Sequence, residues 1–373
     1  MSYAQYVSDV NREVGGTGSG PSARGAGWPT ESRREPFGWA RSQSFAEVSG
    51  SWTPPRRAAF GQGGVETVAV IGDGPIADEL AARAAGSGWS CEHVPLFTRD
   101  ASGIADIRPA TLKTASLILI ALPPSAQPPL SVLLAGCFHP GALVVLVPGQ
   151  PGGAGQIACG IGSDAEVTVA ETSWSPWFGA AGGRLVEVGP VPLATVPARD
   201  AAAVSARLAP LMSTVPVIDT RWTALHAPDV VLRTAPLLVH PAPDSQTLGE
   251  LLAEPAVARM VAAVDAERGA IARALRLDIP SATEWIGAAL GTSASSLSSA
   301  LGELAQAPSP GRYDAYGPRD LVPYGLVPLL ALAEQAGVAV PAINGLIDLA
   351  DQLLVDDHRL GGRNRVRTEV GRS

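Results

Sequence analysis

The chain has 373 residues, of which 46% are hydrophobic and 17% are charged, so it can build two domains that each bury a core. This composition excludes disorder over the full length. With 27 Lys and Arg against 35 Asp and Glu, the net charge is -8, which provides no overall positive field for a phosphate backbone. We therefore expect no nucleic-acid partner.

The three cysteines, Cys91, Cys137 and Cys159, are not spaced as CxxC pairs and lie in or beside apolar runs. This pattern is typical of reduced thiols in a cytoplasmic protein and not of disulfides or a metal site. The first 30 residues include charged side chains and no continuous apolar stretch like that of a secretory signal. The longest apolar runs are far shorter than the roughly 20 residues of a membrane-spanning helix. We expect a soluble, cytoplasmic protein with no membrane partner and no metal.

Both ends of the chain are poor in core-forming residues. Residues 1–63 are rich in Gly, Ser, Pro and Arg and sustain neither a helical nor a strand period. Such a segment cannot bury enough apolar surface to fold alone, so we predict a disordered extension. The polar and basic residues 357–373 predict a flexible tail.

From residue 65 onward, apolar runs alternate with helical segments. A buried strand, a glycine turn, an Ala-rich helix and a second strand come first, in ETVAVIGDGPIADELAARAAGSGWSCEHVPLFTRD. Further strands are expected at 116–124, 141–149, 166–170, 185–188 and 215–218, with a helix at 200–212. Near-continuous apolar strands that alternate with helices are typical of a doubly wound parallel sheet. We predict an α/β fold whose N-terminal, dinucleotide-binding Rossmann domain spans residues 64–225.

After about residue 225 the strand patterns end and helical patterns follow. Helices are expected at 254–275, 281–290, 295–306, 321–336 and 341–355. Pro341 suits the first turn of a helix, and Gly337 suits a helix end. We predict an all-helical C-terminal domain over residues 226–356, which would carry substrate-binding and catalytic residues.

A glycine-rich turn joins the first expected strand to the first helix. It has the pattern G-x-G-x-x-A, formed by Gly72, Asp73, Gly74, Pro75, Ile76 and Ala77. The first glycine allows a tight turn, the second lets the backbone approach a pyrophosphate, and the alanine allows close helix packing. The helix N-terminus favours an anion. We predict a dinucleotide site here; a purely structural glycine turn is the alternative.

The end of the second strand indicates which ribose is bound. Thr98 and Arg99 offer a hydroxyl and a planar cation that suit a 2′-phosphate, which favours NADP. NAD is the alternative, in which Asp100 binds the ribose and Arg99 is a solvated surface residue.

The segment RDLVPYGLVPLLALAEQAGVAVPAINGLIDLADQLL (319–354) resembles the C-terminal signature of the octopine/nopaline (opine) dehydrogenase family, E-D-V-P-x-G-L-V-P followed by G-V-x-x-P-x-I. Further similar segments follow the family's order: the G-x-G-x-x-A loop, ALPPSA, VPGQPGGAG, VAETSWSPW, VHPAP and VDAERGAIARAL. The resemblance spans residues 65–355. It implies an NAD(P)-dependent dehydrogenase acting on CH–NH, which condenses an amine with a 2-oxo acid and reduces the imine, in opine, metallophore or other secondary metabolism.

His226 and His240 lie at the expected domain junction, and by spacing alone a packed structural role is the simpler interpretation of His240. The resemblance implies instead that His240 is the catalytic acid or base and that Asp320 is its partner. A carboxylate can orient an imidazole that protonates the substrate. Read without a gap, the family's aspartate falls on Leu321, so Asp320 is the partner only if the alignment slips by one residue.

The resemblance also implies contacts to cofactor and substrate. Pro123 and Ser125, in ALPPSA, are expected at the cofactor. The family's arginine, expected to hold a substrate carboxylate, falls near Ala315 or Tyr316, and Arg312 is the nearest substitute. Thr234 and Tyr324 are the other expected substrate contacts.

Two other functions remain open from the residues. One is a ketone or imine reductase that tailors a secondary metabolite, and the other is a non-catalytic nucleotide-binding scaffold that kept the fold. The expected partners are small molecules. A homodimer is the assembly considered, and the sequence names neither the amine nor the oxo acid.

Overall fold

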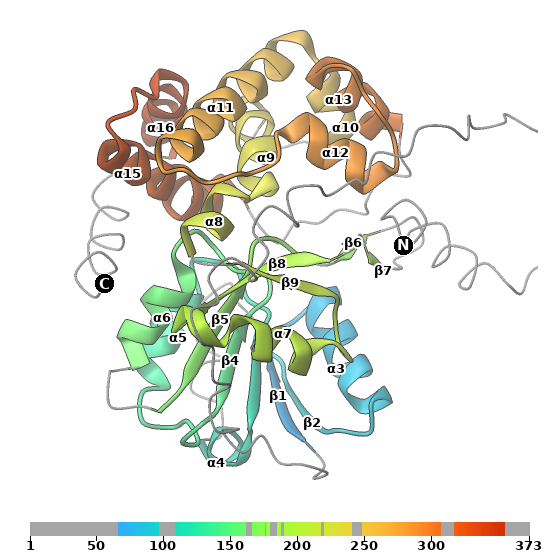
Figure 1. Cartoon of the computed structure of the whole chain (residues 1–373), viewed down its shortest axis with the longest axis vertical. Coiled ribbons are helices and arrows are strands. Elements are labelled where there is room, and N and C mark those ends of the chain that lie inside the picture. The colour runs from blue at the N-terminus through green and yellow to red at the C-terminus, as the bar shows by residue number, and fades with distance from the viewer. Residues whose placement is uncertain are drawn as a thin grey trace, which may run out of the picture.

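The chain folds into a sheet domain and a helical domain, which Figure 1 shows as its lower and upper halves. The computed structural model describes residues 66–96, 109–161, 166–175, 177–179, 185–187, 190–217, 220–240, 248–306 and 317–354. The predicted extension 1–63 and tail 357–373 lie outside the described residues. Where the chain is described, none of the helices combines the length and the apolar character needed to cross a membrane.

The sheet domain is built on one seven-stranded sheet with the order β2-β1-β3-β4-β5-β8-β9. Neighbours from β2 to β5 are parallel, β8 is antiparallel to β5, and β9 is parallel to β8. The strands are β1 (Thr67–Ile71), β2 (Ser90–Val94), β3 (Leu117–Ile120), β4 (Leu143–Leu146), β5 (Thr168–Thr172), β8 (Val191–Val196) and β9 (Thr214–Pro216). The predicted Rossmann-type sheet is confirmed.

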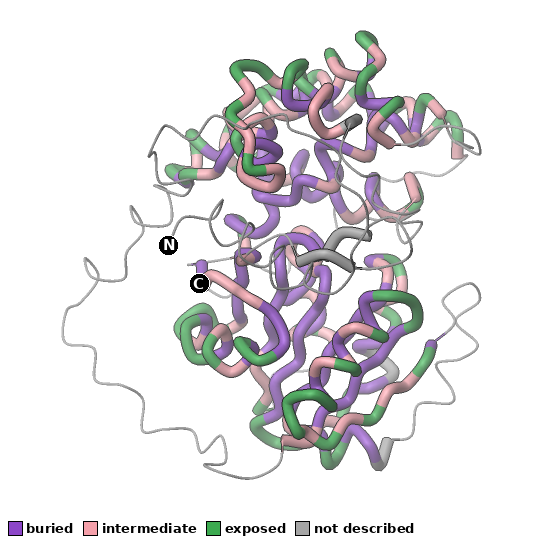
Figure 2. The backbone as a smooth tube through the Cα atoms, turned by 90° about the vertical axis from the view of Figure 1, so that its right-hand side faces the viewer, coloured by how far each residue is buried: buried purple, intermediate pink, exposed green. Residues whose placement is uncertain are grey.

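Helices cover both faces of this sheet. Val68 and Val70 pack with α3 (Pro75–Gly86) and α7 (Ala201–Leu208). Ala69 and Ile71 point to the opposite face, where α4 (Pro109–Thr114), α5 (Gln127–Leu133) and α6 (Gly153–Ile161) pack. Successive strand residues alternate between faces, so a strand covered on both sides is apolar throughout. Figure 2 shows this buried core along the strands.

The structure differs from the predicted strand pattern in two places. The strand predicted at 185–188 exists as β7 (Leu185–Glu187), but it pairs with β6 (Trp177–Gly179) in a separate two-stranded sheet. The sequence analysis also missed β8, which lies inside the main sheet. Pro192 and the following Pro197 weaken its strand signal because proline cannot donate to a ladder. The burial of Val191, Leu193 and Ala194 against the rest of the sheet domain and the helices overrides that signal.

The described part of the second domain is helical, as predicted. Its helices are α8 (Thr220–Leu225), α9 (Pro228–Val239), α10 (Leu248–Ala253), α11 (Pro255–Ala274), α12 (Ala282–Leu290), α13 (Leu297–Gln306), α14 (Pro318–Leu321), the π-helical turn η4 (Val322–Leu326), α15 (Val327–Ala336) and α16 (Pro341–Leu354). Gly337 ends α15 with φ +66°, and Pro341 begins α16, which confirms both boundary predictions. The Glu267 carboxylate accepts from the first backbone N–H groups of α16.

Three helices, α8, α9 and α10, were not predicted. In α9 eight of its twelve residues are buried, so its apolar side chains are not confined to one stripe and give no clear helical period. Pro236 inside the helix obscures it further. The helical conformation of α9 is stabilised by packing against α11, α14 and α16. These contacts are long-range, so no local sequence pattern predicts them.

A buried carboxylate joins the two domains. Glu171, fully buried at the end of β5, accepts from the backbone N–H of Ala154 at the start of α6 at 2.6 Å. It also accepts from the Thr223 hydroxyl of α8. A charge taken out of water must be hydrogen-bonded to be tolerated, so this contact holds α8 against the carboxyl end of the sheet.

Candidate functional site

The predicted glycine loop lies directly between β1 and α3. Gly72 has φ +143°, and a Cβ there would lie 2.3 Å from the carbonyl oxygen of Ala121, just after β3. Gly74, with φ +87°, precedes Pro75 at the first position of α3, and no side chain caps this helix. A helix start without a side-chain cap leaves its N–H groups and its dipole available for an anion. The loop therefore fits the pyrophosphate of a dinucleotide.

The loop also lies at the point where the strand order reverses. The chain passes from β1 to β2 on one side and then to β3 on the other side of β1. Ligands of open α/β sheets bind in the crevice at this switch point. The predicted cofactor residues Pro123 and Ser125 follow β3 at the same edge, while the side chains of Ile76 and Ala77 are buried and hold α3 against the sheet.

A histidine that the sequence analysis overlooked contacts this loop. His93, near the end of β2, places Nε2 2.9 Å from the carbonyl oxygen of Gly72. The next residue, Val94, accepts from the Gly72 backbone N–H at 3.1 Å. Thr98 and Arg99 come shortly after and lie outside the described residues, so the choice between NADP and NAD stays a prediction.

A cleft lies between the two domains. The loops after β3, β4 and β5 form one wall, and the start of α9 with the α14–η4 segment forms the other. The polar or charged residues in the two walls are Gln150, Ser173, Trp174, Asp229, Asp320 and Tyr324. Domain interfaces of this kind supply the concavity that a small-molecule site needs.

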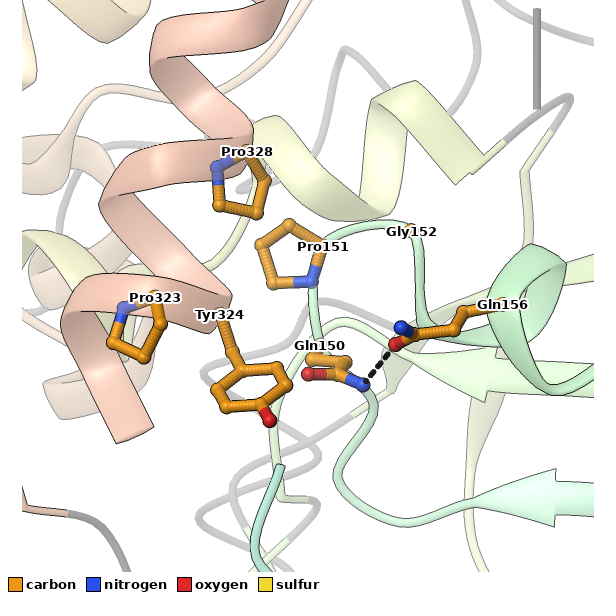
Figure 3. Close-up of a pocket in the computed structure, with 7 residues that line it drawn as sticks. All are labelled: Gln150, Pro151, Gly152, Gln156, Pro323, Tyr324 and Pro328. Carbon is orange, nitrogen blue, oxygen red and sulfur yellow. Dashed lines mark hydrogen bonds between the residues drawn. The ribbon is translucent and has the colours of Figure 1, made fainter. Parts of the chain in front are cut away.

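A small neighbouring pocket shares Gln150, Pro151 and Tyr324 with this cleft. Figure 3 shows the Tyr324 ring beside Gln150, whose Nε2 donates to Gln156 Oε1 at 3.4 Å, while its own Oε1 points away from Gln156. Tyr324 belongs to the π-helical turn η4, a type of turn that is frequent at functional sites. Tyr324, an expected substrate contact, thus lies in the cleft wall.

Asp320 lies in the same cleft. Its Oδ1 accepts from the backbone N–H of Ser125 at 3.1 Å, across the domain boundary. Leu321, the other position that the resemblance left open, is 5% exposed and also lines the cleft. Asp320 therefore contributes a carboxylate to the helical wall of the cleft.

The structure does not join His240 to Asp320 as predicted. His240 follows the last residue of α9, and its Nε2 lies 3.3 Å from Glu254 Oε2. Val230, at the other end of α9, lines the cleft, and a rise of 1.5 Å per residue places Val239 about 14 Å further along the helix axis. His240 therefore contacts Glu254, whereas Asp320 contacts Ser125, because α9 presents its N-terminal end to the cleft; the catalytic roles of His240 and Asp320 stay predictions.

The other expected substrate contacts have different outcomes. Thr234 is 1% exposed, and its hydroxyl donates to the carbonyl oxygen of Val230 in its own helix at 2.6 Å. The Thr234 hydroxyl therefore hydrogen-bonds within α9, and Thr234 is not among the residues that line the cleft. Arg312 lies outside the described residues.

His226, the second junction histidine, is a packed residue. Its ring stacks between Trp174 and Trp222, with both centroid distances 4.6 Å. Burial, followed by the nearby Arg268 charge, lowers the pKa of His226 well below its usual value. The neutral His226 ring packs against Trp174, which forms part of the cleft wall.

Four polar residues of the cleft were not predicted as site residues. Gln150 lies in the segment VPGQPGGAG, and Ser173 and Trp174 lie in VAETSWSPW; both segments carried the family resemblance and so held a usable signal. Asp229 had no such signal, because it lies at the start of the unpredicted helix α9.

Comparison with known proteins agrees with this arrangement. A family model described as NAD/NADP octopine/nopaline dehydrogenase, alpha-helical domain, matches residues 224–354. The chain is 30% identical over 292 residues to an opine dehydrogenase of Arthrobacter sp. (strain 1C), which covers 73% of this chain and 78% of that protein.

Solved structures share the fold at lower identity. Octopine dehydrogenase in complex with NADH and agmatine is 16% identical with a TM-score of 0.62, covering 82% of this chain and 96% of that one. Yersinopine dehydrogenase with NADP+ bound is 13% identical with a TM-score of 0.56, covering 82% and 98%. A ketopantoate reductase of Ralstonia eutropha JMP134 is 15% identical with a TM-score of 0.50, covering 81% and 99%.

Proposed function

Because this chain belongs to the opine dehydrogenase family, whose members are NAD(P)-dependent dehydrogenases acting on CH–NH bonds, we propose that it condenses an amine with a 2-oxo acid and reduces the imine to a secondary amine. The family membership makes it an oxidoreductase that uses a nicotinamide cofactor and small-molecule substrates. The proposal adds the reductive condensation and a place in opine, metallophore or other secondary metabolism.

One observation carries this proposal: the interdomain cleft opens at the carboxyl ends of β3, β4 and β5, next to the switch point at the glycine loop. A condensation needs two substrates held beside one cofactor, and orienting them supplies a large part of the rate. When bound, the nicotinamide supplies the hydride. The residues of the chain hold the substrates and provide the proton.

We propose NADP as the preferred cofactor. The support is the sequence after β2, where Thr98 and Arg99 suit a 2′-phosphate. The glycine loop at the start of α3 would hold the pyrophosphate in either dinucleotide. The Arg99 contact alone would therefore separate NADP from NAD.

We also propose His240 as the proton donor, from the family resemblance, with Glu254 in the orienting role first assigned to Asp320. The support for Glu254 is its 3.3 Å contact with the imidazole. For His240 to act, the reacting carbon must lie toward the C-terminal end of α9. Asp320, in the cleft wall, is then available to contact substrate.

The experiment is NADPH and NADH oxidation with a matrix of amines and 2-oxo acids, with the products identified by mass. Oxidation that needs both substrates and yields their secondary amine supports the proposal. Oxidation with the oxo acid alone, giving a hydroxy acid, would make the chain a ketone reductase. No oxidation with any pair would overturn the proposal.

A further inference from the structure

Gly72 is the first residue beyond the paired part of β1 and β2, whose register ends at Ile71 and Val94. Two contacts then hold Gly72 to β2. Its backbone N–H donates to the Val94 carbonyl oxygen at 3.1 Å, and its own carbonyl oxygen lies 2.9 Å from His93 Nε2. A carbonyl oxygen can only accept, so Nε2 is assigned as the N–H of the ring. Gly72 is buried, and a buried backbone carbonyl needs such a donor.

The position of His93 on β2 directs its ring toward α3. His93 is level with Val70 of β1, whose side chain belongs to the core that α3 covers, and strand side chains alternate between faces. The His93 Nδ1 lies 3.8 Å from Asp78 Oδ1 in the first turn of α3. This distance is too long for a hydrogen bond, so Asp78 provides a nearby negative charge. The ring therefore lies between the edge strand and the start of α3.

The contact with His93 determines how the peptide between Gly72 and Asp73 is turned. In a planar trans peptide the C=O and the N–H point in opposite directions. Because the Gly72 C=O points toward β2, the Asp73 N–H points away from β2. The backbone N–H groups of this loop, at the start of α3, are the donors that suit a pyrophosphate.

We propose, building on the pyrophosphate site proposed at this loop, that His93 is a positioning residue for the dinucleotide. It contacts the loop and not the cofactor, and it holds the Gly72–Asp73 peptide in the orientation that presents the Asp73 N–H to a phosphate oxygen. Gly72, with φ +143°, has the backbone freedom that the turn requires, and the same freedom lets this peptide rotate. A side-chain contact that restricts the rotation orders the donor before the anion arrives, which lowers the cost of binding.

A direct contact between His93 and a 2′-phosphate is the competing role, because the ribose is recognised at the end of the second strand. The contacts of the ring favour positioning. Nε2 is engaged by Gly72, and Nδ1 faces the Asp78 carboxylate, whose charge would repel a phosphate. The two roles differ in their effect. A positioning residue affects every dinucleotide equally, whereas a 2′-phosphate contact affects NADPH alone.

The test uses two variants of the full chain. His93→Leu removes the donor and keeps a side chain of similar size, and His93→Gln returns an amide N–H near the position of Nε2. Each is titrated with NADPH, NADH and ADP-ribose, which share the pyrophosphate, so no substrate is needed. We expect His93→Leu to raise all three dissociation constants by a similar factor of about threefold to tenfold, the effect of one ordinary hydrogen bond. His93→Gln should recover most of the affinity.

Thr111→Val is the matched control. The Thr111 hydroxyl donates to Glu92 Oε1 at 2.9 Å, on the opposite face of the same strand. This variant also removes a side-chain hydrogen bond to β2, so it should lower the free energy of unfolding and leave the three dissociation constants unchanged. Urea denaturation of every variant separates a loss of stability from a loss of affinity.

The outcomes separate this inference from the proposals it builds on. Unchanged dissociation constants in His93→Leu, even with lower stability, would make the contact purely structural and overturn the inference. A loss confined to NADPH, or an equal loss in Thr111→Val, would also overturn it. A wild-type chain that binds none of the three nucleotides would overturn the pyrophosphate site as well. The expected binding pattern without any reductive condensation would overturn that reaction and support the inference.

Discussion

The backbone N–H of Ser125 donates to Oδ1 of Asp320 at 3.1 Å, joining the loop after β3 to α14. One partner lies at the switch point of the sheet and the other in the helical wall of the cleft. The contact is exposed to solvent, so its contribution to the free energy of unfolding is small. The contact nevertheless links the two domains, because Ser125 belongs to the sheet domain and Asp320 to the helical domain.

The glycine loop can be tested at Gly72. In Gly72→Ala the new Cβ would lie 2.3 Å from the Ala121 carbonyl oxygen, and φ +143° is unfavourable for alanine. Strain of this kind costs about 1–3 kcal/mol, so we expect lower unfolding free energy and weaker cofactor binding, measured by urea denaturation and nucleotide titration. Gly74→Ala is the control for the unfolding free energy, since φ is also positive there but no other atom would lie within 4 Å of its Cβ. Equal losses would show that the approach to Ala121 is unimportant.

Cofactor preference can be tested at Arg99. A charge-assisted hydrogen bond to a 2′-phosphate contributes about 1.5–3 kcal/mol, so Arg99→Ala should weaken NADPH binding by about tenfold to a hundredfold and leave NADH binding nearly unchanged. Fluorescence titration with both cofactors measures this. Lys113→Ala, on the exposed side of α4 before β3, removes the same charge at the opposite end of the sheet and should have no effect. Equal wild-type affinities would contradict the NADP prediction.

The proton donor can be identified with three variants. His240→Ala should lower kcat by about two to four orders of magnitude with little change in cofactor affinity, because it removes the acid and not the phosphate site. Glu254→Gln should lower kcat less and leave KM nearly unchanged, and Glu254→Asp should restore part of the loss. A fully active His240→Ala enzyme would show that another group donates the proton.

Stability should depend on pH through His226. Its folded-state pKa is lowered by burial, so below the unfolded value of about 6.5 the unfolded chain binds a proton that the folded chain does not. The free energy of unfolding therefore falls as pH drops below that value, by up to about 1.4 kcal/mol per pH unit. Urea denaturation between pH 5 and 8 should show this slope.

His226→Phe keeps an aromatic ring between Trp174 and Trp222 and cannot be protonated, so the slope should become flatter. His139→Gln, at an exposed position, should leave it unchanged. An unaltered slope in His226→Phe would assign the pH dependence to other groups.

The sequence by itself determined the two-domain architecture and the nucleotide loop. The apolar runs of β1, β3 and β4 indicate strands covered on both faces, and the glycines at 72 and 74 are required by local backbone geometry. The end of α15 at Gly337 and the start of α16 at Pro341 also depend on local backbone geometry. The C-terminal signature placed the chain in its family, because such a motif is contiguous.

Only the tertiary structure decided which side chains meet. Gln150, Ser173, Asp229 and Asp320 come from four separate segments and gather because α9 and α14 pack across the carboxyl ends of β4 and β5. Likewise, His240 contacts Glu254 and not Asp320 because α9 runs away from the cleft. Helix direction and packing across a domain boundary arise from contacts between residues far apart in the chain, which local spacing does not record.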